Sequence, residues 1–478
     1  AQAWRNIVFT LQAQHLPKKE FTSYLQDLPN TQYSQIWKAV LNYELLLGSP
    51  KSGAALDEAI EVLAKVNNKA IKNTNPNITS PSLEGDSSEK IIALVHHGRS
   101  GTGLLHSLID GHPEVSTLPS IYFSQYFDHL TWKEIVSGGW GGMVDRFMGI
   151  YDVLFDAASK VPIPTHGREL IYDIGQKEGL TGLGDDRNEI LSVDREIFRE
   201  ELERLMNHHS ELTAFVFFKL VHAAYDKAIG DTHEKKLIFY HIHNPDNYAQ
   251  LNFVQSSPKA DWLIMVREPI QSCESWIRDS FERNEYDVIS SKILTMLFKV
   301  DDIIYHQRNA IGLRLEDLKE SPDKTIPSLC RWMGIQETES LYEMTAQGKK
   351  WWGDPSSPDY AEGGMDPFGN TPLRRKIGSI FSADDQFILR TLFYPFSVSF
   401  GYTKENLKQF KSDLKTVRPM LNQLFDFEKA LIEAGKFEPA RFMKSGSYLY
   451  LRSGLIERWN TLNELGTYPK MIKPLRIN

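Results

Sequence analysis

Short apolar runs alternate with polar or helical segments through the middle of the chain. The runs fall at residues 90–96, 214–220, 237–242 and 262–266. Uninterrupted runs of this length are typical of strands that are buried on both faces of a parallel sheet. The pattern therefore predicts a three-layer α/β fold, with helices covering both faces of the sheet.

Helical periodicity replaces this pattern at both ends of the chain. Apolar residues recur at helical spacing in residues 54–66, and again from Leu407 through Phe410, Leu414 and Val417. Residues rich in Asn, Pro, Ser and Gly lie between the first helices and the first strand. We therefore expect a helical N-terminal extension (1–72), a linker (73–89), an α/β domain (90–402) and a helical C-terminal extension (403–478).

A glycine-rich turn joins the first predicted strand to a helix. The turn reads Gly98-Arg99-Ser100-Gly101-Thr102-Gly103-Leu104. Backbone N–H groups and the positive end of a helix dipole meet at such a turn, which suits a phosphate or sulfate. The glycines admit a close anion, the two hydroxyls can donate hydrogen bonds, and Arg99 adds a positive charge. A nucleoside-triphosphate loop would end in Gly-Lys-Ser/Thr, whereas this turn has Gly101-Thr102-Gly103.

A second group suited to an anion follows the run at residues 262–266. Arg267 comes directly after the run, Pro269 stands where it can start a helix, and Ser275 lies eight positions after Arg267. A guanidinium group binds phosphate through two hydrogen bonds, and the carboxyl edge of a parallel sheet is where ligands bind. The alternative is a surface pair between Arg267 and Glu268.

Together these two segments resemble the sulfotransferase family. The loop at residues 98–104 resembles that family's 5′-phosphosulfate loop, and Arg267 with Ser275 matches its 3′-phosphate element. Arg375 and Lys376 resemble the basic loop that closes over the nucleotide. The resemblance covers about residues 90–402 and implies a P-loop-like sulfotransferase core with α-helical extensions at both ends.

The resemblance also implies a reaction. The co-substrate would be 3′-phosphoadenosine-5′-phosphosulfate, whose sulfuryl group moves in line to a hydroxyl or amine of a small-molecule or glycan acceptor, without a metal. Arg99 would stabilise charge on the transferred group. His243 resembles the histidine of the family's Lys-Thr-His-Leu-Pro element, which deprotonates the acceptor, although His241 stands where that element has lysine.

Two further sets of residues leave alternatives open. Lys219 and His222, at the end of the predicted strand 214–220, form a rival catalytic pair to His243. The aromatic residues Tyr122, Phe123, Tyr126 and Phe127 fit either an acceptor pocket or the hydrophobic core.

Composition narrows the class of protein. The chain has 478 residues and a net charge of −8, which argues against a nucleic-acid binder. No apolar run is long enough for a membrane span, residues 1–12 lack a signal-peptide pattern, and Cys273 and Cys330 are the only cysteines. We therefore expect a cytoplasmic protein. A P-loop kinase or hydrolase and a non-catalytic nucleotide-binding protein are the competing functions.

Overall fold

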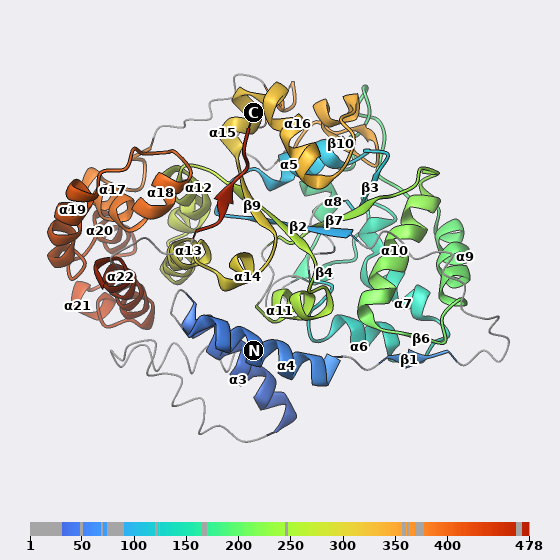
Figure 1. Ribbon diagram of the computed structural model, residues 1–478, viewed down its shortest axis with the longest axis horizontal. Coiled ribbons are helices and arrows are strands. Elements are labelled where there is room, and N and C mark those ends of the chain that lie inside the picture. Colours follow the sequence, from blue (N-terminus) through green and yellow to red (C-terminus); the bar gives the residue numbers. More distant parts are fainter. Residues whose placement is uncertain are drawn as a thin grey trace.

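The centre of the molecule is a six-stranded sheet in which every strand runs parallel to its neighbours (Figure 1). This computed structural model describes residues 31–47, 51–67, 70–73, 90–119, 123, 125–164, 170–243, 247–355, 360, 363–368, 377–464 and 471–477. The strand order is β12-β9-β8-β2-β7-β3. The bounds are β2 Lys90–His96, β3 Val115–Thr117, β7 Leu237–His241, β8 Asp261–Val266, β9 Ala310–Arg314 and β12 Lys473–Pro474. The predicted α/β class is confirmed.

Both faces of the sheet are covered, which explains why its strands are apolar at successive positions. In the central strand β2, Ile92 and Leu94 pack into one hydrophobic core, while Ile91, Ala93 and Val95 pack into another. Side chains alternate between the two faces of a strand, so a strand between two helical layers needs apolar residues at every position.

Different helices form the two outer layers (Figure 1). Three helices contribute to the core beside Ile92 and Leu94: α5 Thr102–Ile109, α15 Leu315–Glu320 and α16 Pro322–Met333. The helices that contribute to the opposite core include α3 Gln32–Leu46, α4 Ser52–Asn67, α10 Ala214–Ala228, α11 Asn247–Ser256 and α14 Ile303–His306. The predicted three layers are present, and the predicted N-terminal helices pack directly on one of them.

The apolar run at residues 214–220 is a helix, so the predicted strand there was wrong. It forms the first half of α10, which begins where the Thr213 hydroxyl accepts a hydrogen bond from Val216 N at 3.3 Å. Phe217, Phe218 and Leu220 are all buried because this helix packs on several sides. A short apolar run does not distinguish a buried strand from a buried helix by its period.

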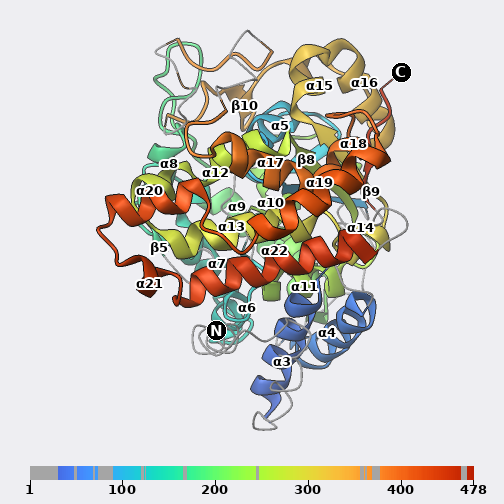
Figure 2. The ribbon, with the colours of Figure 1, turned by 90° about the vertical axis from the view of Figure 1, so that its left-hand side faces the viewer.

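The C-terminal helices share a separate core with two helices of the α/β part. The two helices of the α/β part are α12 Pro269–Glu282 and α13 Tyr286–Lys299. The C-terminal helices that share their core are α17 Ala383–Leu392, α19 Leu407–Met420, α20 Asp426–Ala434, α21 Pro439–Phe442 and α22 Gly446–Glu464. Figure 2 shows them stacked on one side of the molecule, with α18 Tyr394–Ser399 nearby. Helices were expected throughout this part, but its last described segment forms β12, which pairs with β9.

Smaller elements lie between β3 and β7. They are α6 Thr131–Val136, α7 Met143–Ile150, β4 Ile163–Pro164, β5 Leu170–Ile171, α8 Ile174–Lys177, α9 Arg195–Met206 and β6 Glu211–Leu212. The strand β6 pairs with β1 Ile71–Lys72, which follows the N-terminal helices. A hairpin of β10 Thr345–Ala346 and β11 Lys349–Lys350 lies farther along the chain.

Candidate anion-binding site

The carboxyl ends of three adjacent strands, β7, β2 and β8, meet at one edge of the sheet. Leu94 of β2 pairs with His241 of β7, and His96 of β2 pairs with Met265 of β8. Strands that follow β2 in the chain lie first on one side of it and then on the other. This edge is therefore the point where the strand order reverses, which is where α/β proteins bind ligands.

The glycines of the loop at residues 98–104 have different roles. Gly98 and Gly101 adopt positive φ angles of 67° and 86°. A Cβ atom on Gly98 would lie 2.4 Å from the Ser272 hydroxyl, and one on Gly101 would lie 2.7 Å from Leu315. A Cβ on Gly103 would meet no atom within 4 Å. The first two glycines are thus required by backbone and packing, whereas Gly103 leaves open space beside the first turn of α5.

The N-terminus of α5 is available to an anion. The helix begins at Thr102, and its N-cap, Gly101, provides no side chain to cap the first N–H groups. Ser100 is buried, and its hydroxyl accepts a hydrogen bond from His97 N at 3.3 Å. Arg99 is half-buried and has no ion-pair partner within the described ranges. The loop therefore presents uncapped donors and one guanidinium group, as expected for a phosphate or sulfate site. Leu104 packs into the core behind it.

Arg267 and Ser275 lie where the sequence predicts, at the end of β8 and on α12. Their exposed fractions are 6% and 7%. Pro269 is the first residue of α12, and the Glu268 carboxylate caps that helix by accepting from Gln271 N at 2.7 Å. The Glu268 carboxylate also pairs with Arg390 at 2.9 Å. A guanidinium group buried at the edge of the sheet can form short, charge-assisted hydrogen bonds to an anion.

Glu274 connects α12 to the chain that follows the predicted basic loop. Its carboxylate is 2% exposed and accepts from Gly378 N at 3.0 Å, Ser379 Oγ at 2.6 Å and Ile380 N at 2.8 Å. Arg375 and Lys376 lie outside the described residues, but the chain directly after them is anchored beside Ser275. Sequence reasoning missed this anchor. The available signal was a glutamate on a helix whose neighbouring positions are buried.

His243 lies at the end of β7, beside the loop. Its half-buried ring stacks on that of His96, with the centroids 5.2 Å apart, and His96 Nδ1 donates to the Gly98 carbonyl at 2.9 Å. Burial lowers the pKa of His243 to about 4, and the positive charges of Lys299 and Arg99 act in the same direction. The imidazole is therefore neutral near pH 7 and can accept a proton, and a bound anion would raise its pKa.

A second buried histidine occupies the position where the family element has lysine. His241 lies 5.6 Å from His243 and 5.3 Å from His106, measured between ring centroids. Neither of its ring nitrogens has a hydrogen-bond partner in the described part of the chain, and burial lowers its pKa well below the usual value. A neutral imidazole thus stands where the resemblance leads us to expect a cation.

Lys219 and His222 do not lie at a strand end, so their predicted placement was wrong. Both are on α10. His222 is 1% exposed, its Nδ1 lies 3.1 Å from Ser116 Oγ, and burial lowers its pKa to about 3. Its ring packs 4.9 Å from that of Phe218. These contacts favour a structural role for His222.

The aromatic residues near position 123 belong to the hydrophobic core. Phe123, Tyr126 and Phe127 are buried, and all three contact the ring of Phe218. Tyr122 lies outside the described residues. The acceptor-pocket alternative is therefore not supported for these three side chains.

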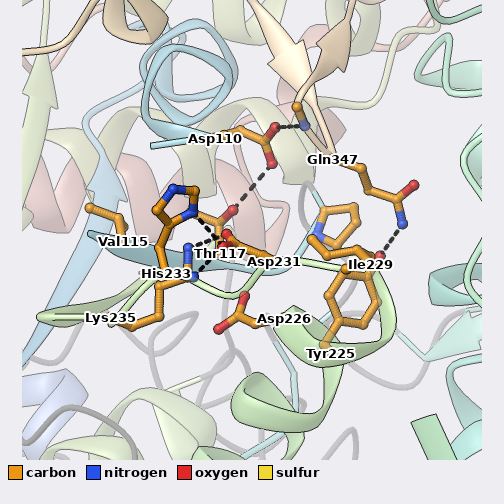
Figure 3. A pocket seen from close by; sticks show the side chains of 14 residues that line it. Asp110, Val115, Thr117, Tyr225, Asp226, Ile229, Asp231, His233, Lys235 and Gln347 are labelled. Carbon is orange, nitrogen blue, oxygen red and sulfur yellow. Dashed lines mark hydrogen bonds and ion pairs between the residues drawn. The ribbon is translucent and has the colours of Figure 1, made fainter. Parts of the chain in front are cut away.

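A cavity of about 220 Å³ opens beside the edge strand β3 (Figure 3). Val115, the first residue of β3, and Asp110, which follows the last residue of α5, both line it. Asp110 accepts hydrogen bonds from Thr117, Thr345 and Gly348 N at 2.9 to 3.1 Å. Asp110, which lines the cavity, is thus already bonded to neighbouring groups. The residues that line the cavity include neither Arg267 nor any residue of the anion loop.

The described residues contain no cluster of three or more His, Cys, Asp or Glu side chains arranged to hold a metal ion. None of the helices in these ranges combines the length and apolar character that crossing a bilayer requires.

Comparisons with known proteins give little independent support for any particular function. No protein-family model and no curated protein matches the chain. One solved structure, the sulfotransferase domain of the Synechococcus PCC 7002 olefin synthase, aligns over 66% of this chain and 98% of its own, at 14% identity and a TM-score of 0.35. A similarity this distant carries no argument, so a function must be argued from the site itself.

Proposed function

We propose that this chain transfers a sulfuryl group from 3′-phosphoadenosine-5′-phosphosulfate to a hydroxyl or amine. The observation that carries the proposal is the meeting of three groups at one sheet edge: the uncapped α5 N-terminus, the buried Arg267 and the neutral His243. A donor with two separated anionic groups needs two anion-binding elements, and a hydroxyl acceptor needs a base.

Each element has a distinct role in binding the donor. The loop at residues 98–104 and the first turn of α5 would hold the 5′-phosphosulfate. Arg267 and Ser275 would hold the 3′-phosphate, and Arg375 with Lys376 would close over the nucleotide. The anchor of residues 378–380 on Glu274 supports this last role because it holds the neighbouring chain next to Ser275.

The transfer itself is a single in-line displacement. The acceptor oxygen attacks sulfur while His243 takes the acceptor proton, the bond from sulfur to the bridging phosphate oxygen breaks, and adenosine 3′,5′-bisphosphate leaves. Arg99 stabilises the negative charge on the oxygens around sulfur. Catalysis of this kind depends on positioning and on fixed positive charge.

Nucleotide binding tests the proposal directly. Calorimetry should show that the parent chain binds adenosine 3′,5′-bisphosphate, and that Arg267→Ala weakens this binding by on the order of 2–4 kcal/mol, because a charge-assisted pair of hydrogen bonds is lost. The matched control is Arg441→Ala, at an exposed position on α21, which should bind like the parent. Equal affinities in all three proteins would contradict the donor assignment.

A non-catalytic nucleotide-binding protein is the main alternative, because a histidine with a pKa of about 4 is a weak base. Transfer of label from radiolabelled donor to a panel of hydroxyl and amine acceptors distinguishes the two. Nucleotide binding without any transfer would favour the alternative.

A further inference from the structure

One face of helix α13 is held against the anion loop. Met296 accepts a hydrogen bond from His97 Nε2 at 3.0 Å through its carbonyl oxygen, and its sulfur lies 2.9 Å from the place where a Cβ on Gly98 would stand. Lys292 and Lys299 lie four positions before and three positions after Met296. Residues at these spacings share one face of a helix, so the two lysines flank the loop contact on either side.

Lys292 is fixed against α12, beside the Trp276 ring that contacts His96 at the end of β2. Its ammonium group donates to the Trp276 carbonyl at 2.9 Å and to the Ser280 hydroxyl at 3.2 Å, and it lies 5.6 Å from the centre of the Trp276 ring. Trp276 follows Ser275 in α12 and also contacts the His96 ring at 5.4 Å. Burial lowers the pKa of Lys292; Asp279 and Glu285 oppose this shift, and the charges of Arg283 and Arg99 add to it.

Lys299 approaches the loop from the other side. Its positive charge lowers the pKa of His97, which follows β2, and of His243, the proposed base. The acid that acts on Lys299 is Asp302, whose carboxylate already accepts hydrogen bonds from the Tyr43 hydroxyl at 2.5 Å and from Ile304 N at 2.9 Å.

None of the three cations around the loop forms an ion pair in the described ranges, where no carboxylate lies within 4.0 Å of the charged group of Arg99, Lys292 or Lys299. Asp279 and Glu285 act on Lys292, and Asp302 acts on Lys299, only at longer range. Partly buried positive charges without an ion pair lower the stability of a protein, and their mutual repulsion lowers it further. A bound anion would offset both effects.

We propose that Lys292 and Lys299 bind the 5′-phosphosulfate end of the donor. They would supply the positive charge that the loop lacks at Gly101-Thr102-Gly103 and that β7 lacks at His241. This inference rests on the proposed function, and it adds two binding residues from a helix that carries none of the motifs behind the family resemblance.

A comparison of two nucleotides distinguishes binding at the 5′ end of the donor from binding at its 3′ end. Calorimetry would compare adenosine 3′,5′-bisphosphate with adenosine 3′-monophosphate, which lacks the 5′ anion. Lys299→Met and Lys292→Met should each weaken binding of the bisphosphate by on the order of 10-fold to 100-fold and leave binding of the monophosphate within about twofold. Arg267→Ala should weaken binding of both nucleotides, and Lys299→Arg should retain most of the bisphosphate affinity.

The control is Lys415→Met, which removes a lysine from an exposed position on α19 and should bind like the parent. Thermal unfolding of Lys299→Met should occur at the parental temperature or above, since methionine fills the same space without a buried charge. The inference would be overturned if both lysine variants bound the bisphosphate like the parent, or if they bound both nucleotides equally more weakly. It would also be overturned if Lys299→Met unfolded at a markedly lower temperature than the parent. If the parent bound neither nucleotide, the proposed function itself would be wrong.

Discussion

At the scale of single residues, the site depends on which protonation state burial favours. His97, His222 and His243 have pKa values lowered to about 4, 3 and 4 by burial, so all three are neutral near pH 7. Of the three, only His243 is half-buried rather than buried, and its ring stacks on that of His96 beside the loop. The same chemical group thus has structural contacts at His222 and the proposed catalytic role at His243.

We expect His243→Ala to slow sulfuryl transfer by about 10²–10⁴-fold while donor affinity stays near the parental value, because a general base acts on the acceptor. Single-turnover transfer with saturating donor measures this rate. His222→Gln serves as the comparison and should retain transfer. A parental rate for His243→Ala with a large loss for His222→Gln would move the base to α10.

The lowered histidine pKa values also predict how stability depends on pH. Between about pH 6.5 and pH 4 the unfolded chain binds protons at these histidines and the folded chain does not, so stability falls as the pH falls. Each such histidine contributes a slope of about 1.4 kcal/mol per pH unit in that range. Denaturant unfolding of the parent and of His222→Gln at pH 7 and pH 5 checks this, since the variant should lose less stability on acidification.

At the scale of elements, contacts with the neighbouring helices α12 and α13 fix the conformation of the glycine loop. Ser272 of α12 donates to the His97 carbonyl at 2.8 Å, and Met296 of α13 accepts from the His97 ring. Gly98 fits only because it lacks a Cβ atom in this contact. The loop is therefore part of a unit with α12 and α13, and substitutions in either helix should change anion binding.

The two outer glycines of the loop should respond differently to alanine. Gly98→Ala should destabilise the protein by more than about 1 kcal/mol, because it combines a positive φ with contacts under 3.0 Å. Gly103→Ala meets no protein atom, so it should leave stability close to that of the parent. If Gly103 faces the donor, the same change should still weaken nucleotide binding. Thermal unfolding together with calorimetry separates the two effects.

The Glu274 anchor predicts a change in protease sensitivity. Glu274→Gln loses charge-assisted hydrogen bonds to residues 378–380, which should cost about 1–3 kcal/mol locally and favour tryptic cleavage after Arg375 and Lys376. In the parent, adenosine 3′,5′-bisphosphate should slow that cleavage. Equal cleavage with and without nucleotide would contradict closure of the basic loop.

At the scale of the whole molecule, the C-terminal helices pack against the two helices that carry part of the proposed site. The core around α12 and α13 is completed by residues of α19, α20 and α22, including Phe410, Leu414, Phe425 and Leu451. Arg458 of α22 forms a buried ion pair with Asp301, which closely follows α13. The helices that carry Ser275, Lys292 and Lys299 are therefore supported by the last part of the chain.

Removing one partner of this buried pair should be costly. Arg458→Met leaves the Asp301 carboxylate buried without its cation and should lower the free energy of unfolding by about 3–5 kcal/mol. Adding Asp301→Leu should restore much of that loss, because no unpaired charge then remains. Denaturant unfolding of the parent, both single variants and the double variant forms a cycle that measures the coupling. Additive losses would show that the pair is not coupled.

The sequence by itself determined the elements whose signals are local. An apolar run followed by glycines predicts β2, the loop at residues 98–104 and the start of α5, and a run followed by Arg and Pro predicts β8 and α12. Parallel pairing then implies that Gly98, Arg267 and His243 share one edge, as the register confirms. Each of these strands, turns and helices depends on residues that are close to one another in the chain.

Only the tertiary structure decided the rest. The helical state of residues 214–220, the small strand β12, the Glu274 anchor and the lysine face of α13 all depend on contacts between segments far apart in the chain. His97 meets Met296 across 199 positions, and Glu274 meets Gly378 across 104. A helix or a two-residue strand at such a place is stabilised by what packs against it, and that partner leaves no mark on the local pattern of residues.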